Sequence, residues 1–322
     1  MTSKQAPGSR FASLPQRVAV AVVAIPVILW LALAGGYPFF FFVALISGLA
    51  LQEFYKLTEA KGAFPLKTLG LFAGFVVNAS FIYERIQVDT FSYLAARGIR
   101  PSMFSQHQFF SVTIILFALI VVLVELFRTH GSALANAGAT ILGVLVISLG
   151  FGTLVMTREL FPHGFPVGRY FTSPIAGDVQ MAQIDRWGGG TIIALLASIW
   201  VCDTAAYFAG VYLGRHKLFE RVSPGKTWEG SAAGFVGAVA TFWVARQVGL
   251  SYLSMENAII LGVLVGVFGQ LGDLVESRFK RDAGVKDSSA LIPGHGGIYD
   301  RFDSLVFVAP IVYLYIDFVV LS

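Results

Sequence analysis

Apolar residues occur along this chain in long runs that are separated by short polar segments. A helix needs about 20 apolar residues to cross the hydrocarbon core of a bilayer. Nine stretches reach or nearly reach this length: 17–34, 38–57, 66–83, 109–127, 135–157, 190–213, 230–246, 255–271 and 303–321. The pattern therefore predicts an all-α, polytopic integral membrane protein with about nine transmembrane helices.

The first of these stretches has a second interpretation. Lys4, Arg10 and Arg17 precede it, and Ala32-Leu33-Ala34 resembles the cleavage site of a secretory signal peptide. However, the apolar run is long, and another apolar run follows almost at once. An uncleaved first span is therefore favoured, with a removable signal peptide as the alternative.

The distribution of Lys and Arg predicts how the helices are oriented. With nine spans, 16 of the 23 basic residues lie on the side of the N-terminus and seven lie on the other side. Basic residues concentrate on the cytoplasmic side of membrane proteins. The N-terminus is therefore expected in the cytoplasm, together with segments 214–229 and 272–302. The long connections 84–108 and 158–189 are expected outside, as variable loops or short interfacial helices.

Composition narrows the class of protein further. Only 13% of the residues are charged, whereas soluble domains carry roughly a quarter. The net charge of +4 suits anionic lipid head groups but is too small to indicate a nucleic-acid partner. The single cysteine, Cys202, excludes an internal disulfide and a cysteine-based zinc site, and its apolar neighbours predict a packing role.

Charge is concentrated between Asp273 and Asp303, a segment with six acids, five bases and one histidine. Asp273, Glu276 and Lys280 share one face of a helix because they are spaced i, i+3 and i+7. Two carboxylates on one face form a candidate Mg²⁺ site, although such a pair alone is more typical of a solvated helix end. Here several basic residues follow, and these can offset the charge of a polyphosphate.

The end of the same segment predicts an irregular loop. Pro293-Gly294-His295-Gly296-Gly297 cannot continue a helix, and the backbone amides of such a turn can bind an anion. His295 can hydrogen-bond a phosphate or transfer a proton, and a purely structural histidine is the alternative. Acids then begin the last apolar stretch, where they are also ordinary helix caps.

A second group of candidate residues begins in the sixth stretch. Asp203 has apolar neighbours on both sides, and a carboxylate at the centre of a membrane helix costs about 2.5–3.5 kcal/mol on insertion scales. It is therefore expected to face a polar cavity, with a paired packing role as the alternative. Further along, Gly225-Lys226-Thr227 suggests a phosphate-binding loop. That interpretation is rejected because the first glycine of the motif is missing and no strand is expected before it.

These residues together resemble the phosphatidate cytidylyltransferases, also called CDP-diacylglycerol synthases. The resemblance is carried by Ser277-Arg278-Phe279-Lys280-Arg281, Lys286-Asp287, Pro293-Gly294-His295-Gly296-Gly297 and Asp300-Arg301-Phe302-Asp303. Segments 203–207, 223–230 and 272–277 are also similar to motifs of that family. Two regions follow: an N-terminal transmembrane region, 1–187, and a C-terminal transmembrane catalytic region, 188–322.

The resemblance implies a reaction and its components. CTP and phosphatidic acid would give CDP-diacylglycerol and pyrophosphate, with Mg²⁺ required and a second cation left open. The protein would be a multi-pass component of the cell inner membrane with its site on the cytoplasmic face. A homodimer is left open.

On this basis each candidate residue receives a role. The expected metal ligands are Asp273, Asp203 and Glu276. The expected phosphate-binding residues are Lys226, Lys280, Arg281, Lys286 and Arg301. Asp287, His295, Asp300 and Asp303 are expected to complete or order the loop. The nucleotide is also expected to contact Ser288, Gly296, Gly297 and Glu229, and Glu229 has a metal-binding or loop-ordering role as its alternative.

Three other classes fit parts of the pattern. A transporter would explain an acid within a membrane helix, but the charge lies at one face and the halves show no paired short segments. A CTP-dependent polyprenol kinase would transfer the γ-phosphoryl group and release CDP, so its products distinguish it. A structural membrane scaffold is disfavoured by the density of polar residues in 273–303.

Overall fold

The computed structural model describes residues 14–99, 102–171, 177–289, 291 and 296–322. Its helices are α2 (Leu14–Ala34), α3 (Gly36–Glu59), α4 (Lys67–Phe81), α5 (Tyr83–Ala95), α6 (Gln106–Phe127), α7 (Ala133–Gly143), α8 (Leu149–Gly164), α9 (Val167–Tyr170), α10 (Asp178–Leu213), α11 (Trp228–Val248), α12 (Met255–Asp282) and α13 (Tyr299–Tyr315). Two π-helical turns, η1 (Val144–Ser148) and η2 (Ile316–Val320), join α7 to α8 and extend α13. Strands β1 (Lys217–Phe219) and β2 (Ser223–Thr227) pair in antiparallel orientation.

The fold is that of a multi-pass membrane protein. Within the described residues, six helical segments are long and apolar enough to cross a bilayer: α3, α6, α7 to α8, α10, α12 and α13 with η2. A seventh results if α4 and α5, which are bent by 68° at their junction, form one span. All nine predicted stretches are helical, so the all-α prediction is confirmed apart from the hairpin. Nine crossings and a cytoplasmic N-terminus stay predictions.

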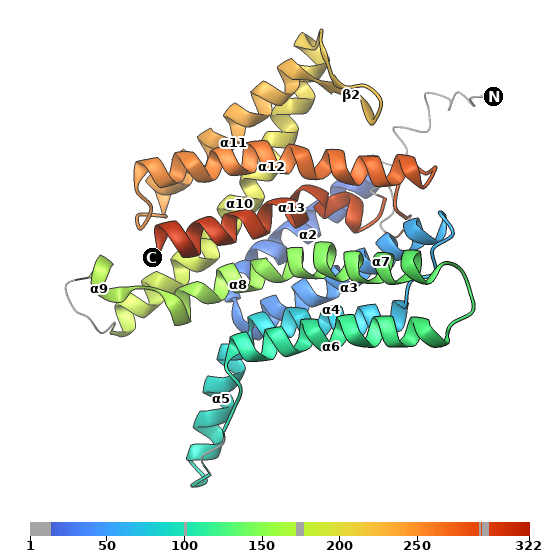
Figure 1. Ribbon diagram of the computed structural model, residues 1–322. Coiled ribbons are helices and arrows are strands. Elements are labelled where there is room, and N and C mark those ends of the chain that lie inside the picture. Colours follow the sequence, from blue (N-terminus) through green and yellow to red (C-terminus); the bar gives the residue numbers. More distant parts are fainter. Residues whose placement is uncertain (1–13, 100–101, 172–176, 290, 292–295) are drawn as a thin grey trace.

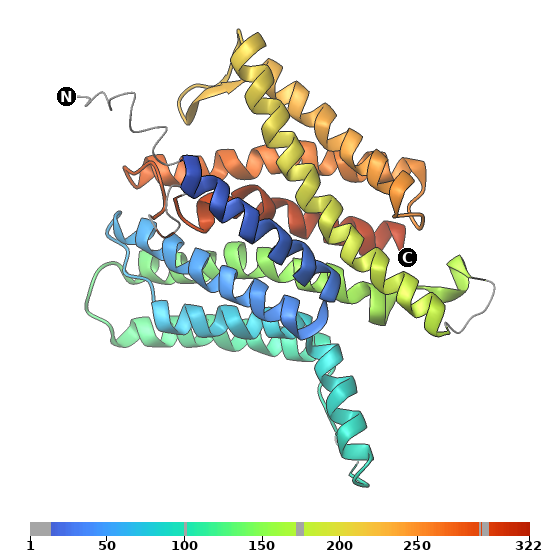
Figure 2. The same ribbon diagram turned by 180° about the vertical axis from the view of Figure 1, so that it is seen from behind.

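The helices form a bundle with one oblique pair. Helices α3, α4, α6, α8, α12 and α13 run alongside one another, and α5 projects from the bundle (Figures 1 and 2). Helices α10 and α11 pack together and cross the bundle obliquely, with the β1–β2 hairpin at the end where they meet (Figure 1). The hairpin and the nearby part of α12 thus lie around a region that contains several of the charged candidate residues, among them Lys226 and Asp273.

Glycines allow the helices around this region to approach closely. A Cβ at Gly234 of α11 would lie 2.8 Å from the carbonyl oxygen of Cys202 in α10, where Cys202 is buried. A Cβ at Gly262 would lie 2.5 Å from the backbone of α11, and one at Gly272 would lie 3.0 Å from the backbone of α13. Such close contacts are typical of helix pairs in membranes. These contacts pack α10 against α11, α11 against α12 and α12 against α13 around the site.

Side-chain caps and aromatic contacts fix the ends of these helices. The Thr227 hydroxyl accepts a hydrogen bond from the Gly230 N–H at 3.2 Å, which starts α11 directly after β2. Phe54 of α3 makes edge contacts with Phe279 of α12 and Tyr299 of α13, at centroid distances of 5.9 and 6.3 Å. The N-terminal helices therefore support the C-terminal ones.

Several boundaries differ from the sequence-based expectation. Helix α10 begins at Asp178, within the expected outer connection, so the division at 187/188 falls inside one continuous helix. Helix α12 continues to Asp282, which places Asp273 to Lys280 on a helix as expected from their spacing. Segment 214–229 contains two strands where no strand was expected. The strands are three and five residues long and show no apolar alternation that would mark them.

Candidate active site

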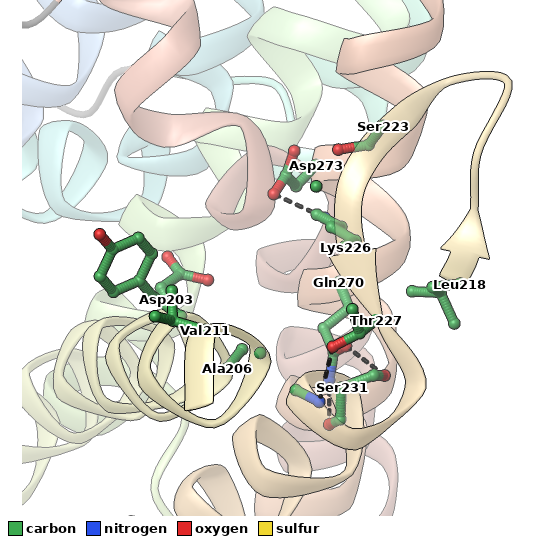
Figure 3. Close-up of a pocket in the computed structure, with 14 residues that line it drawn as sticks. Asp203, Ala206, Val211, Leu218, Ser223, Lys226, Thr227, Ser231, Gln270 and Asp273 are labelled. Carbon is green, nitrogen blue, oxygen red and sulfur yellow. Dashed lines mark hydrogen bonds and ion pairs between the residues drawn. The ribbon is translucent and has the colours of Figure 1, made fainter. Parts of the chain in front are cut away.

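A cavity of about 500 Å³ lies between the hairpin and helices α10, α11 and α12. Three charged side chains line it: Asp203 from α10, Lys226 from β2 and Asp273 from α12. Figure 3 shows Asp203 and Asp273 on different walls, with Lys226 extending toward Asp273. The Lys226 ammonium lies 2.6 Å from Asp273 Oδ2. A ligand in this cavity would meet two carboxylates and one ammonium group.

A group of three carboxylates adjoins the cavity. Asp273, Glu276 and Asp303 each offer an oxygen within 4.8 Å of the others. Asp273 and Glu276 lie one turn apart on α12, and Asp303 comes from the beginning of α13. The expected metal ligands were Asp203, Asp273 and Glu276. In the structure, Asp303 lies beside Asp273 and Glu276, while Asp203 faces the cavity from α10.

Glu276 is the most buried member of this acidic group, with 1% of its side chain exposed. Its Oε2 lies 2.6 Å from the Lys280 ammonium, whereas Oε1 has no hydrogen-bond partner among the described residues. A buried carboxylate of this kind normally has partners for its oxygens. A bound cation would provide a partner for Oε1, so Glu276 indicates a ligand-binding role for the acidic group.

The charges and donor atoms of the acidic group fit a divalent cation. Three carboxylates at this spacing repel one another, and the repulsion is strong away from bulk water. Lys226 and Lys280 offset part of the negative charge through their ion pairs with Asp273 and Glu276. All the ligand atoms are oxygens, which are the ligands that Mg²⁺ prefers, with further positions filled by substrate phosphates and water.

Lys280 connects the acidic group to the loop before α13. Its ammonium lies 2.6 Å from Glu276 Oε2 and 2.8 Å from Asp300 Oδ1. Asp300 accepts hydrogen bonds from the N–H groups of Ser288 and Gly297, at 2.9 and 2.8 Å. Through these contacts Asp300 orders the loop before α13. They also show that Lys280, Ser288 and Gly297 are engaged with the protein itself.

Glu53 of α3 binds the same loop. It was not among the candidate residues predicted from the sequence. Its carboxylate accepts hydrogen bonds from the hydroxyls of Ser288 and Ser289, at 2.9 and 2.6 Å. It also accepts from the N–H groups of Ile298 and Tyr299, at 3.1 and 2.8 Å. A signal for it exists in the sequence, because an acid inside an apolar stretch is normally functional or paired.

Gly297→Ala is expected to destabilise this loop by about 1–3 kcal/mol, the usual cost of overpacking. A Cβ at Gly297 would clash with Ser288 Oγ and Glu53 Oε2, and hydrogen bonds hold both atoms in place. The thermal unfolding midpoint in detergent measures the effect. Gly249→Ala is the matched control, because a Cβ there meets nothing within 4 Å. Equal midpoints for the two variants would contradict the loop geometry.

Glu229 lies at the start of α11 and orders the turn between α10 and β1. Its carboxylate accepts a hydrogen bond from the Arg215 N–H at 3.1 Å and lies 2.7 Å from His216 Nδ1. The bond to His216, followed by those to backbone N–H groups, lowers the pKa of Glu229 to about 2. Of the roles considered for Glu229, these contacts fit the ordering of the loop.

The remaining candidate residues lie at the edge of the site. Arg281, Lys286 and Asp287 are exposed and line neither the cavity nor the acidic group, and Arg301 is exposed in the first turn of α13. Gly296 has a φ of +82°, a conformation that favours glycine. His295 lies outside the described residues.

Helices long enough to cross a membrane surround a charged cavity, and a group of three carboxylates adjoins it. This arrangement is that of a membrane enzyme suited to charged substrates. Over residues 15–319 the chain matches the family described as the cytidylyltransferase family. The chain belongs to this family and is therefore a nucleotidyltransferase, as the motifs of its C-terminal region predicted.

Curated relatives support the same assignment. The phosphatidate cytidylyltransferase of Synechocystis sp. is 32% identical over 311 residues, which cover 94% of this chain and 96% of that protein. The phosphatidate cytidylyltransferase of Bacillus subtilis is 30% identical over 304 residues, which cover 93% and 96%. The protein of that name from Staphylococcus aureus is 48% identical over 117 residues, which cover 35% of this chain and 44% of that protein.

Proposed function

We propose that this protein is a phosphatidate cytidylyltransferase of the cell inner membrane, with its site on the cytoplasmic face. It transfers the cytidylyl group of CTP to phosphatidic acid, which yields CDP-diacylglycerol for phospholipid biosynthesis and releases pyrophosphate. The observation that carries this proposal is the acidic group of Asp273, Glu276 and Asp303 beside a cavity that contains Lys226. Relatives of that name, aligned over nearly the whole chain, supply the identity of the substrates.

The acidic group would hold Mg²⁺. Asp273, Glu276 and Asp303 are its ligands in this proposal, and Asp203 completes the acidic lining of the cavity from α10. When bound, Mg²⁺ would offset the charge of the CTP phosphates and of the pyrophosphate that leaves. The cation would also give Glu276 Oε1 the partner that the described residues do not supply.

The reaction joins two anions, so binding and orientation are the main tasks of the protein. A phosphate oxygen of phosphatidic acid attacks the α-phosphorus of CTP. The bond to the bridging oxygen of the β-phosphate breaks, and that oxygen leaves with the electron pair as part of pyrophosphate. Lys226 is exposed to the cavity and is assigned to a CTP phosphate. Lys280, held by Glu276 and Asp300, is assigned to keeping the acidic group in place.

Product analysis tests the proposal. Purified protein in detergent is incubated with Mg²⁺, phosphatidic acid and one of CTP, ATP, GTP or UTP. Pyrophosphate and CDP-diacylglycerol are expected with CTP, and EDTA should abolish both products. Release of CDP in place of pyrophosphate would indicate a kinase. Solute flux in proteoliposomes without nucleotide turnover would indicate a transporter. Either result would overturn the proposal.

A further inference from the structure

An apolar groove of about 590 Å³ lies beside the hairpin, between the β1–β2 turn and α12. Its apolar walls consist of Phe219, Val222, Leu271, Leu274, Val275 and Phe279. Two arginines, Arg221 and Arg278, also line it, and both residues are exposed. Within the part of the chain that the structure describes, neither guanidinium forms a hydrogen bond or an ion pair.

The groove and the candidate active-site cavity share the same two walls. On the hairpin, Leu218 lines the cavity and the next residue, Phe219, lines the groove, because successive strand residues point to opposite faces. On α12, Asp273 lines the cavity and the adjacent Leu274 lines the groove. The hairpin and α12 therefore separate the groove from the cavity by the thickness of one element.

The order of residues along α12 suits a lipid with its head group at one end. Leu271 and Leu274 precede Arg278, and the rise of 1.5 Å per residue separates Leu271 from Arg278 by about 10 Å along the helix. An acyl chain can lie along the apolar part while a phosphate reaches the arginine. Arg278 is joined there by Arg221 from the hairpin turn.

Charge distinguishes between lipids at such a site. Two guanidinium groups without protein partners match a phosphomonoester, which carries about −1.5 to −2 charge at neutral pH. A phosphodiester lipid carries a single negative charge and offers fewer free oxygens. We propose that the groove captures phosphatidic acid, with its phosphate between Arg221 and Arg278 and an acyl chain on the apolar wall. This inference rests on the proposed function and identifies where the lipid substrate is held before it enters the cavity.

Kinetics of Arg221→Gln, Arg278→Gln and the double variant test this groove. Phosphatidic acid is titrated in mixed micelles at saturating CTP. Each single variant is expected to raise the KM for phosphatidic acid about tenfold, because each loses one charge-assisted contact. The double variant should raise it further, and kcat and the KM for CTP should stay unchanged. Lysine at either position should restore part of the affinity. Arg215→Gln is the matched control, an exposed arginine that lines neither the groove nor the cavity.

A binding measurement without CTP separates this inference from the proposed function. Native mass spectrometry in neutral detergent compares retention of added phosphatidic acid with retention of phosphatidylglycerol. The wild-type protein should prefer phosphatidic acid, and the double variant should lose the preference. An unchanged KM for phosphatidic acid in the double variant, or an equal rise in Arg215→Gln, would overturn the groove site alone. Wild-type protein that makes no CDP-diacylglycerol would overturn the proposed function, while the lipid preference would still report on the groove.

Discussion

Asp273→Asn is expected to lower kcat for CDP-diacylglycerol formation at least about 100-fold. Asp273 belongs to the acidic group, lines the cavity and pairs with Lys226 at 2.6 Å. The asparagine keeps the size of the side chain but removes the charge that would hold a divalent cation, and loss of one electrostatic contact in an active site commonly costs this much. Initial rates at saturating CTP and phosphatidic acid measure the effect. Raising the Mg²⁺ concentration should recover part of the lost rate.

The matched control for this variant is Asp282→Asn at the end of the same helix. Asp282 is half exposed, and its carboxylate lies 3.7 Å from the Lys61 ammonium, a weak surface contact. Its turnover should remain close to that of the wild type. If Asp273→Asn also retained wild-type turnover, Asp273 would have no place among the metal ligands.

Glu53→Gln is expected to lower the free energy of unfolding by about 2–3 kcal/mol and to reduce activity more than tenfold. The Glu53 carboxylate is 3% exposed and accepts hydrogen bonds from two hydroxyls and two N–H groups of the loop before α13. A glutamine amide offers one oxygen and would direct its NH₂ group at donors that need an acceptor. Thermal unfolding in detergent and hydrogen exchange of residues 296–300 would measure the change.

Glu59→Gln on the same helix is the matched control. Glu59 is partly exposed and pairs with Lys67 at 2.7 Å, so its loss should cost less than about 1 kcal/mol. Equal shifts in the two variants would mean that α3 responds to any loss of charge. Wild-type exchange of the loop in Glu53→Gln would mean that Glu53 does not order it.

The helical, multi-pass fold could be predicted because apolar runs of this length form few structures other than membrane-spanning helices. All nine predicted stretches are helical, and in the part of the chain that the structure describes six or seven segments meet the length and apolarity that a crossing requires. The helical placement of Asp273, Glu276 and Lys280 also followed from their spacing. These features depend on residues close in sequence, where periodicity is informative.

The parts that escaped prediction depend on contacts between distant elements. Helical spacing identifies neighbours on α12 but does not tell which acid from another helix approaches them. The sequence therefore placed Asp203 with Asp273 and Glu276, whereas in the structure the third acid of the group is Asp303. Glu53 lies more than 230 residues from the loop that it binds. The hairpin was missed because Gly225 and Pro224 interrupt a strand of five residues.

Anomalous diffraction from crystals grown with Mn²⁺ in place of Mg²⁺ would test most directly whether the acids of α12 and α13 hold a divalent cation. The predicted result is a peak about 2 Å from carboxylate oxygens of Asp273, Glu276 and Asp303, which is lost in Asp273→Asn crystals that are otherwise unchanged. A peak away from these three side chains, or none at all in the presence of CTP, would contradict it.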